Sequence, residues 1–165
     1  MPPLIPPGLC YGRLDVAAIP AGVEALALLR GRLHGLRDPL LLTSPAKRCR
    51  VLAGALGKAV ADARLLELDF GAWEGQPWDS IPRDALDRWA AAPWDFTPPG
   101  GEAVRALHDR VRAVADELRR GGRDAVVVSH GGPLRLLPAL LRGKVPDPLA
   151  PSPGFGAAVL VTALP

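Results

Sequence analysis

The chain has 165 residues, of which 48% are hydrophobic and 22% charged, and its net charge is +3. This composition is typical of a single globular domain over residues 1–165 and excludes a disordered chain. No apolar run is long enough to span a membrane. Because the positive charges are scattered along the chain, the pI of 9.3 does not indicate a nucleic-acid partner. Cys10 and Cys49 are two thiols in a sequence without a secretory-type apolar segment, which favours a cytoplasmic location.

The chain begins with a proline-rich segment, in which positions 2, 3, 6 and 7 are proline. Proline removes the donors that an inner strand needs, so we expect an extended loop leading into Leu9–Asp15. Such a loop suits the rim of a binding site, where Arg13 could contact an anion. A surface turn with a solvated Arg13 is the alternative. Apolar residues at helical spacing then predict a helix over 21–33.

A short buried strand is predicted over Leu40–Thr43, and a helix is expected to begin directly after it. Ser44 is a suitable N-cap, and Pro45 suits the first helical position. The sequence therefore predicts a strand that runs into a helix at this point.

The first turns of this predicted helix carry three cations, Lys47, Arg48 and Arg50. Positive charge there opposes the helix dipole, and a bound phosphate would satisfy both the free N–H groups and an arginine fork. We expect Arg48 to face the carboxyl edge of the sheet and Lys47 and Arg50 to point into water. Cys49 is expected to be a small packing residue.

Three carboxylates, Glu67, Asp69 and Glu74, stand among apolar and aromatic residues. One of them could have the raised pKa that a general acid requires, whereas Asp69 and Glu74 could instead cap or hydrogen-bond turns. Tryptophans at positions 73, 78, 89 and 94 either pack a core or lid, or form a wall for a ring-bearing substrate.

A second loop, residues 98–102, precedes a long amphipathic helix predicted over Val104–Arg120. Glu102 could cap this helix, and His108 is expected on its solvated side. The helix leads into the stretch with the strongest functional signal.

That stretch is a strand predicted over Ala125–Val128, followed by His130, Gly131 and Gly132 at a helix start. Ligands of open α/β sheets bind at the carboxyl ends of strands, and the free N–H groups of a helix start favour anions. His130 and Gly131 are therefore candidates for a phosphate site. A hydrogen-bonded structural histidine is the alternative. A final strand is predicted over Ala157–Leu164.

Four motifs occur in the order seen in the histidine phosphatase (phosphoglycerate mutase-like) superfamily, which the chain resembles from Pro6 onward. They are Ser44-Pro45-x-x-Arg48, Glu67-x-x-x-Gly71-x-x-Glu74-Gly75, Gly100-Gly101-Glu102 and Ser129-His130-Gly131-Gly132. The segment Pro7–Asp15 is similar to the α-ribazole phosphatase branch, which acts late in cobalamin synthesis. The resemblance implies an α/β fold, a three-layer α/β/α sandwich with a mostly parallel central sheet.

The resemblance also implies roles for the matched residues. Arg48 and His130 would hold the phosphoryl oxygens, and Glu67 would be the general acid. The residues expected to bind substrate or phosphate around them are Arg13 (at the rim), Ser44, Glu74 and Gly131. Ala103 stands where relatives usually carry serine, so that loop is expected to bind somewhat differently.

One departure concerns the nucleophile. The family attacks phosphorus with the histidine of an Arg-His pair that ends its first strand, and this sequence has no such pair. Spacing back from Pro7 places the pair before Met1, while His34 and His108 stand in helical contexts. Losing an attacking group costs on the order of 10⁶ in rate, so we expect the chain as given to bind phosphate esters and barely hydrolyse them.

Two explanations are open: the first strand is truncated, with about ten further residues belonging to the full product, or the protein is a pseudoenzyme. The strand is central in the resembled fold, and its loss would leave two unpaired inner edges and a gap through the core. We therefore favour truncation. A translation upstream of Met1 without an apolar run ending in Arg-His would exclude it.

The implied activity is that of a phosphomonoesterase with a phosphohistidine intermediate, needing no cofactor and no metal. A nucleotide-like monophosphate such as α-ribazole 5′-phosphate is the expected small-molecule substrate. A phosphoglycerate mutase-like or broad-specificity phosphatase is an alternative, and no nucleic-acid or membrane partner is expected. The sequence lacks the Cys-x₅-Arg, Gly-x-Ser-x-Gly and Walker patterns of rival chemistries, and it lacks metal-ligand spacing.

Overall fold

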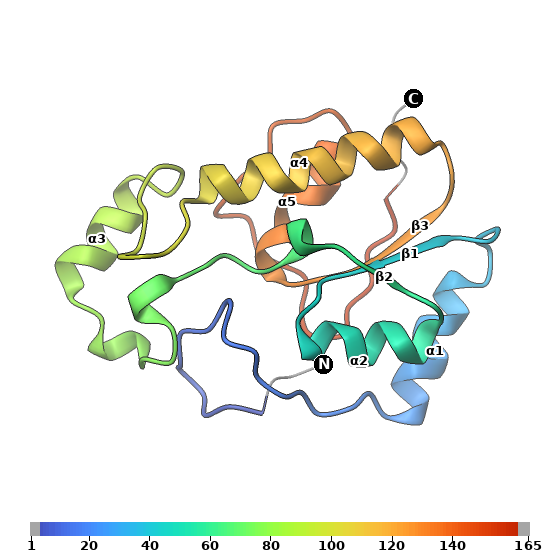
Figure 1. The fold of residues 1–165 in the computed structure, drawn as a ribbon, viewed down its shortest axis with the longest axis horizontal. Helices are drawn as coiled ribbons and strands as arrows, with labels where there is room; N and C mark the ends of the chain where they lie inside the picture. Colours follow the sequence, from blue (N-terminus) through green and yellow to red (C-terminus); the bar gives the residue numbers. More distant parts are fainter. Residues whose placement is uncertain (1–3, 162–165) are drawn as a thin grey trace.

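The computed structural model describes residues 4–161, which form an α/β fold (Figure 1). In chain order the helices and strands are α1 (Val23–Leu33), β1 (Leu40–Thr43), α2 (Lys47–Leu56), β2 (Val60–Ala61), α3 (Arg83–Ala91), α4 (Val104–Gly121), β3 (Ala125–Val128) and α5 (Gly131–Leu141). Short 3₁₀ turns lie at Ala63–Leu65, Gly71–Trp73 and Trp78–Ser80. The predicted strands over 40–43 and 125–128 and the predicted helix from Val104 are confirmed.

The three described strands form a parallel sheet in the order β2-β1-β3. Side chains alternate between the two faces of β3: Val126 and Val128 pack against α2, whereas Val127 packs against the helices of the other face. Helices α4 and α5 lie on one side of the strands, and α2 lies on the other (Figure 1). The expected three-layer arrangement is therefore present.

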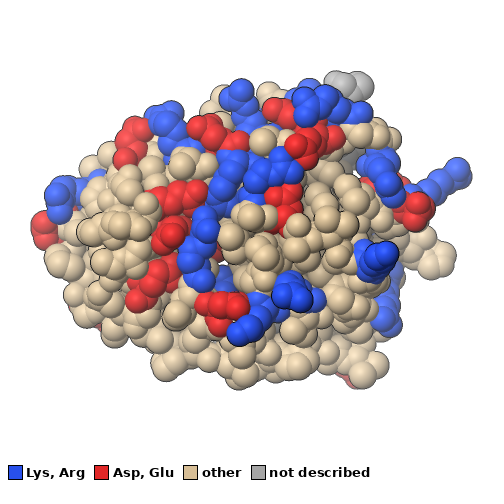
Figure 2. All heavy atoms as spheres, in the orientation of Figure 1, with Lys and Arg blue, Asp and Glu red and all other residues tan. Residues whose placement is uncertain are grey.

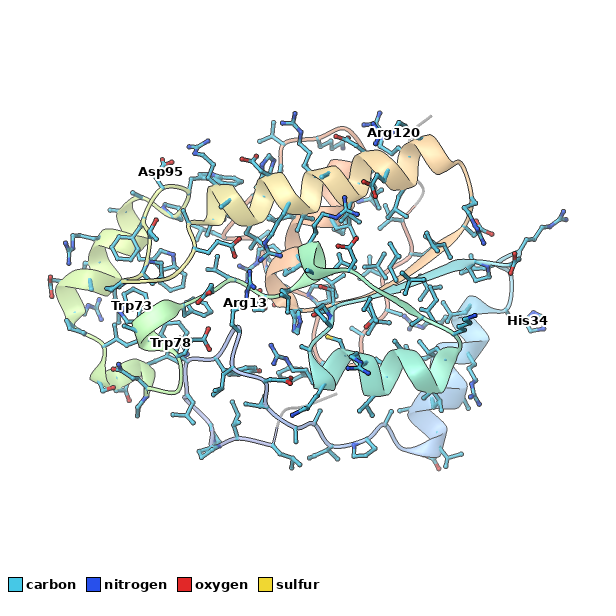
Figure 3. All side chains as sticks on the ribbon, viewed as in Figure 1. Arg13, His34, Trp73, Trp78, Asp95 and Arg120 are labelled. Carbon is cyan, nitrogen blue, oxygen red and sulfur yellow. The ribbon has the colours of Figure 1, made fainter. Side chains whose placement is uncertain are left out.

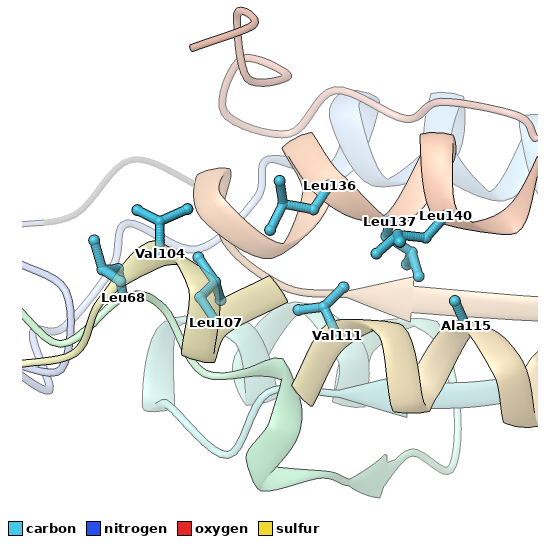
Figure 4. Close-up of a cluster of buried hydrophobic side chains, with 8 residues drawn as sticks. All are labelled: Leu68, Val104, Leu107, Val111, Ala115, Leu136, Leu137 and Leu140. Atoms are coloured by element: carbon cyan, nitrogen blue, oxygen red, sulfur yellow. The ribbon is translucent and has the colours of Figure 1, made fainter. Parts of the chain in front are cut away.

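The largest core cluster joins α4 and α5 (Figure 4). It combines one residue of the 65–75 segment with the apolar stripe of α4 and the inner face of α5: Leu68, Val104, Leu107, Val111, Ala115, Leu136, Leu137 and Leu140. Pro138 lies inside α5 without ending it. This packing fixes the amino end of α5, where His130 and Gly131 lie.

One edge of β3 faces a cavity. Within residues 4–161, β3 pairs with β1 alone, and a cavity of about 1250 Å³ runs along it. Residues 157–161 line the same cavity. From the sequence, loss of the first strand is expected to leave two unpaired inner strand edges. This expectation is corrected, because β1 and β3 pair directly with each other. Among the described strands, the unpaired edge that adjoins the cavity is that of β3.

The predicted strand over Ala157–Leu164 is wrong for residues 157–161, which form no strand; residues 162–164 lie outside the described part of the chain. A strand needs a neighbour to bond its backbone, and the cavity separates this segment from β3. The first helix begins at Val23, two residues later than predicted. None of the helices in residues 4–161 is both long and apolar enough to cross a bilayer.

The helix after β1 begins later than predicted. Its first residue is Lys47, and its N-cap is Ala46, which makes no side-chain cap bond. Ser44 Oγ accepts a 3.3 Å hydrogen bond from the Ala46 N–H, before the helix, so the predicted capping role of Ser44 is corrected. The carboxylate of Asp15 instead accepts from the Lys47 N–H at 2.8 Å. A residue 32 positions earlier caps α2, and no local pattern in the sequence indicated it.

Candidate active site

The two strand–helix junctions bring Arg48 and His130 into contact. Arg48 lies in the first turn of α2 after β1, and His130 is the N-cap of α5 after β3, so the parallel pairing of β1 and β3 places both at one sheet edge. Arg48 Nε donates to His130 Nδ1 at 3.2 Å, and both residues are buried. The sequence predicted this convergence.

The tautomer of His130 follows from its partners. Arg48 Nε–H can only donate, so Nδ1 accepts and the neutral ring carries its proton on Nε2. Nε2 lies 2.7 Å from Ser44 Oγ, which accepts that proton. Burial, together with the positive charge of Arg48, lowers the pKa of His130 to about 3. The ring is therefore neutral near pH 7 and presents one N–H donor.

Arg48 is anchored by the loop of residues 9–15. Its Nη1 donates to the Leu14 carbonyl at 2.9 Å and its Nη2 to the Gly12 carbonyl at 2.6 Å. The guanidinium also lies over the Tyr11 ring, 5.5 Å from the centroid. With the bond to His130, three of its five N–H groups have acceptors among the described residues, and two can serve an anion.

Ser44 is fully buried, and its hydroxyl holds the His130 ring in place. A direct bond from Ser44 to phosphate stays a prediction. Gly131 begins α5 and lines the cavity together with Arg48 and His130, so its N–H lies at the helix start that was expected to bind an anion.

Glu67 lies against the amino end of α5. Both of its carboxylate oxygens are 3.1 Å from the Gly132 N–H, and Oε1 also accepts from the Leu68 N–H at 2.9 Å. A Cβ at position 132 would collide with Glu67 Oε1, so this approach requires glycine. Burial raises the pKa of Glu67, against the lowering effect of these hydrogen bonds. A carboxyl group with a raised pKa at a helix start has the property that a general acid needs.

Arg110 holds the backbone before Glu67 and was not predicted as a site residue. From α4, its Nη1 donates to the carbonyls of Arg64 (2.7 Å) and Leu66 (2.6 Å), and its Nη2 donates to that of Glu67 (3.0 Å). Its Nε and Nη2 also bond Glu102, at 2.8 and 2.9 Å. The sequence offered no signal, because Arg110 is one arginine among several on an amphipathic helix.

Arg13 joins the same network. Its Nε donates to the Glu67 carbonyl at 2.9 Å, and its Nη2 lies 3.5 Å from Glu102 Oε2. Glu102 thus bridges Arg13 and Arg110 and does not cap α4, whose N-cap Ala103 makes no side-chain bond. Burial would raise the pKa of Glu102, but its bonds to Arg110 hold that pKa below the usual range. A contact of Arg13 with substrate stays a prediction.

Glu74 binds backbone amides. Its carboxylate accepts from the N–H groups of Gly12, Arg13, Leu14 and Phe70, at distances from 2.8 to 3.1 Å. It therefore holds the loop that anchors Arg48, and its expected phosphate contact stays a prediction. Asp69 accepts from the Gly71 N–H at 2.9 Å, as a turn-bonding carboxylate does.

The other predicted residues lie as follows. Lys47 and Arg50 are exposed, as expected. Cys49, in α2, packs in the core against the sheet, with its Sγ 3.5 Å from His130 Nε2. Burial raises the pKa of Cys49 to about 11, which keeps the thiol protonated at neutral pH.

Lys and Arg side chains are mixed with Asp and Glu side chains over the face of the molecule shown in Figure 2.

No second imidazole reaches this site from the described residues. His34 is exposed after the end of α1, far from Arg13 (Figure 3). His108 packs edge-on against Trp94, 5.6 Å between ring centroids, and is partly buried, so its predicted solvated position is corrected. Within residues 4–161 no group of three His, Cys, Asp or Glu side chains could hold a metal ion.

Comparison with known proteins identifies the class. Residues 7–156 match the family described as "Histidine phosphatase superfamily (branch 1)", and the chain belongs to this superfamily. The matched region includes Arg48 and His130, which meet at the two adjoining strand–helix junctions. The resemblance read from the four motifs is therefore confirmed.

Individual relatives include phosphatases and mutases. The chain is 28% identical over 149 residues to phosphoserine phosphatase 1 of Hydrogenobacter thermophilus, covering 84% of this chain and 70% of the relative. It is 30% identical over 130 residues to a 2,3-bisphosphoglycerate-dependent phosphoglycerate mutase of Chelativorans, covering 67% and 61%. A solved Escherichia coli structure, provisionally described as an alpha-ribazole-5′-P phosphatase, superimposes with a TM-score of 0.71 at 26% identity, covering 83% and 72%. These relatives support a phosphatase- or mutase-like activity.

Proposed function

We propose that the protein is a phosphomonoesterase that works through a phosphohistidine intermediate. The observation that carries the proposal is the contact between Arg48 and His130, with the Glu67 carboxyl group at the same helix start. Arg48 would offer its two remaining N–H groups to phosphoryl oxygens, and a phosphoryl oxygen would compete with Ser44 Oγ for the Nε2–H of His130. These donors would stabilise the charge on the oxygens in the transition state.

The chemistry divides into two steps. An imidazole nitrogen forms a bond to phosphorus as the bond from phosphorus to the ester oxygen breaks, and Glu67 gives its proton to the departing oxygen. Water then attacks phosphorus and returns a proton to Glu67, and the bond from nitrogen to phosphorus breaks. The raised pKa of Glu67 favours the protonated form that the first step requires.

The attacking imidazole is the part of this mechanism that residues 4–161 do not supply. We propose that it enters on a strand that pairs with the unpaired edge of β3, because the cavity there lies between β3 and residues 157–161. A pseudophosphatase that binds a phosphorylated ligand without hydrolysing it is the second candidate. The absence of a second imidazole beside Arg48 in the described residues favours that candidate.

We propose a nucleotide-like monophosphate, such as α-ribazole 5′-phosphate, as the substrate. The similarity of Pro7–Asp15 to the α-ribazole phosphatase branch supports this choice, as does the likeness to the Escherichia coli structure. A phosphoglycerate mutase-like or broad-specificity activity is the alternative, which the mutase relatives favour.

The test compares residues 1–165 with the longer product translated in frame from upstream of Met1, with EDTA present. The longer product should release phosphate from a nucleoside 5′-monophosphate and form an acid-labile phosphoenzyme, whereas residues 1–165 should only bind. Equal turnover by the two chains would contradict the proposed nucleophile. Binding without turnover by both would support the pseudophosphatase.

Glu67→Gln, made in the active product, tests the acid. Release of an alkyl alcohol should slow on the order of 10²-fold or more, because the alkoxide needs a proton. Release of p-nitrophenolate should change little, since that anion departs unprotonated. Equal slowing of both esters would contradict the role of Glu67 as general acid.

A further inference from the structure

Three aromatic rings, those of Phe70, Trp78 and Trp89, form a compact group in the wall of the cavity. The indoles of Trp78 and Trp89 are stacked, with centroids 5.9 Å apart and an interplanar angle of 5°. Phe70 meets both edge-on, at 5.5 Å and 5.9 Å. Such pairs hold each ring in a defined orientation.

This group lines the same cavity as Arg48 and His130. Tyr11 connects the two, because its ring lies under the Arg48 guanidinium and also faces the cavity. Gly12 then places the backbone directly against Phe70, where a Cβ would lie 2.9 Å from Cδ2 of the ring. A continuous surface therefore leads from the anion donors to the aromatic rings.

The residues of the aromatic wall are themselves uncharged, and the Arg48 guanidinium lies over one of them, Tyr11. This wall is made of Leu9, Tyr11, Phe70, Trp78, Trp89 and Pro93. The ribose or glycerate part of a small polar ester would find few hydrogen-bond partners in such side chains. A flat apolar ring would instead remove its own surface and that of the wall from water.

Core packing alone does not account for these rings. The same cluster contains Trp73 and Phe96, which stack on each other at 5.6 Å and do not line the cavity. Trp73 is only 4% exposed, whereas Trp78 and Trp89 remain partly exposed. Phe96 is partly exposed as well, so contact with the cavity, and not exposure, is what separates Phe70, Trp78 and Trp89 from the rest of the cluster.

We propose that Phe70, Trp78 and Trp89 bind a planar aromatic or heteroaromatic ring in the leaving group of the substrate. This inference rests on the proposed function, since the phosphate must occupy the Arg48–His130 site for the ring to reach the wall. It makes the wall the determinant of selectivity between esters of ring-bearing alcohols and esters of aliphatic ones.

The test measures binding by calorimetry, so that it does not depend on turnover. The probes are phenylphosphonate, propylphosphonate and inorganic phosphate, none of which can be hydrolysed by the proposed mechanism. The protein should bind phenylphosphonate about tenfold more tightly than propylphosphonate. Trp78→Leu should reduce this ratio to about one, and Trp78→Phe should retain part of it. Phe96→Leu is the matched control, from the same cluster but away from the cavity, and should keep the tenfold ratio.

Two results would overturn the proposal, and they are distinguishable. If inorganic phosphate binds but the two phosphonates bind equally, the wall does not select rings, and the proposed function stands. If no probe binds, inorganic phosphate included, the proposed function fails and this inference fails with it. If Trp78→Leu does not fold, the wild-type ratio and its partial loss in Trp78→Phe still decide the matter.

Discussion

At the scale of single residues, the site contains two groups whose pKa values are shifted in opposite directions. His130 is held neutral by burial and by Arg48, which lowers its pKa to about 3. Burial shifts the pKa of Glu67 in the other direction, upward. A neutral imidazole can donate to a phosphoryl oxygen at neutral pH, and a protonated carboxyl group can supply a leaving group with its proton.

The state of His130 predicts how stability depends on pH. In the unfolded chain the ring takes up a proton as pH falls below about 6.5, while the folded ring stays neutral down to about pH 3. The stabilising contribution of the neutral ring is therefore complete above pH 6.5 and is lost as pH falls toward 3. His130→Gln removes this titration, so between pH 6.5 and 4 the wild type should lose on the order of 1 kcal/mol per pH unit more than the variant.

Chemical denaturation at a series of pH values measures this difference in the free energy of unfolding. His34→Gln, at an exposed histidine, is the control and should follow the wild type. A parallel pH dependence in His130→Gln and the wild type would show that His130 is not held neutral.

At the scale of elements, two partly buried charge networks position Arg48 and Glu67. Glu74 ties the loop of residues 9–15 to the turn at Phe70, and that loop in turn holds Arg48. Arg110 ties α4 to the backbone that carries Glu67. Both charges have several partners, so deleting either leaves buried polar groups unpaired.

Removing the Glu74 carboxylate should destabilise the fold. Glu74→Ala leaves four backbone N–H groups without their acceptor, and we expect a loss of about 3 kcal/mol in the free energy of unfolding. Asp79→Ala, at an exposed carboxylate, should change that quantity by less than about 0.5 kcal/mol. A Glu74→Ala loss as small as that of Asp79→Ala would mean that the loop is held by other contacts.

Arg110 should matter far more than its neighbour Arg112 on the same helix. Arg110→Met removes the donor from the carbonyls of Arg64 and Leu66 and one of two arginine donors from Glu102, and should cost at least about 2 kcal/mol. Arg112 is exposed and forms only an ion pair with Asp116 at 4.0 Å, so Arg112→Met should cost less than about 0.5 kcal/mol. Thermal unfolding of the two variants provides the comparison, and equal losses would argue against the network.

The sequence predicted α1, β1, α2, α4, β3 and α5, but not β2 or α3, and it predicted the meeting of Arg48 with His130. These predictions rest on local patterns and on the rule that parallel strands share a carboxyl edge. The sequence did not predict the cap of α2 by Asp15 or the bonds of Arg110, because these join residues far apart in the chain. The strand expected over Ala157–Leu164 did not form in its described part, residues 157–161, for a related reason: a strand forms only where a neighbour supplies backbone partners.

At the scale of the whole molecule, the sheet is asymmetric. β1 is paired on both sides, whereas β3 is paired only with β1 among the described residues and borders the cavity on its other side. The Leu40 N–H bonds the Asp124 carbonyl and the Ser44 N–H bonds the Val128 carbonyl. The backbone groups of Asp124 and Val128 therefore face β1. Because successive residues of a strand direct their N–H and C=O groups to opposite sides, the N–H groups of Ala125 and Val127 point away from β1, toward the cavity.

Amide hydrogen exchange should detect this free edge. The N–H groups of Ala125 and Val127 should exchange faster than those of Val126 and Val128, which face β1. The four residues lie in one strand and therefore serve as their own controls. Equal protection of all four would show that another segment covers the edge of β3.

The most direct test of the account is calorimetric titration of inorganic phosphate into the wild type, Arg48→Met and Arg50→Met. Both arginines lie in the first turns of α2, but Arg48 is buried against His130 and Arg50 is exposed. One phosphate should bind per chain, with at least about 30-fold weaker affinity in Arg48→Met and less than about a twofold change in Arg50→Met. Equal affinity in the wild type and Arg48→Met would contradict the assignment of this junction as the phosphate site.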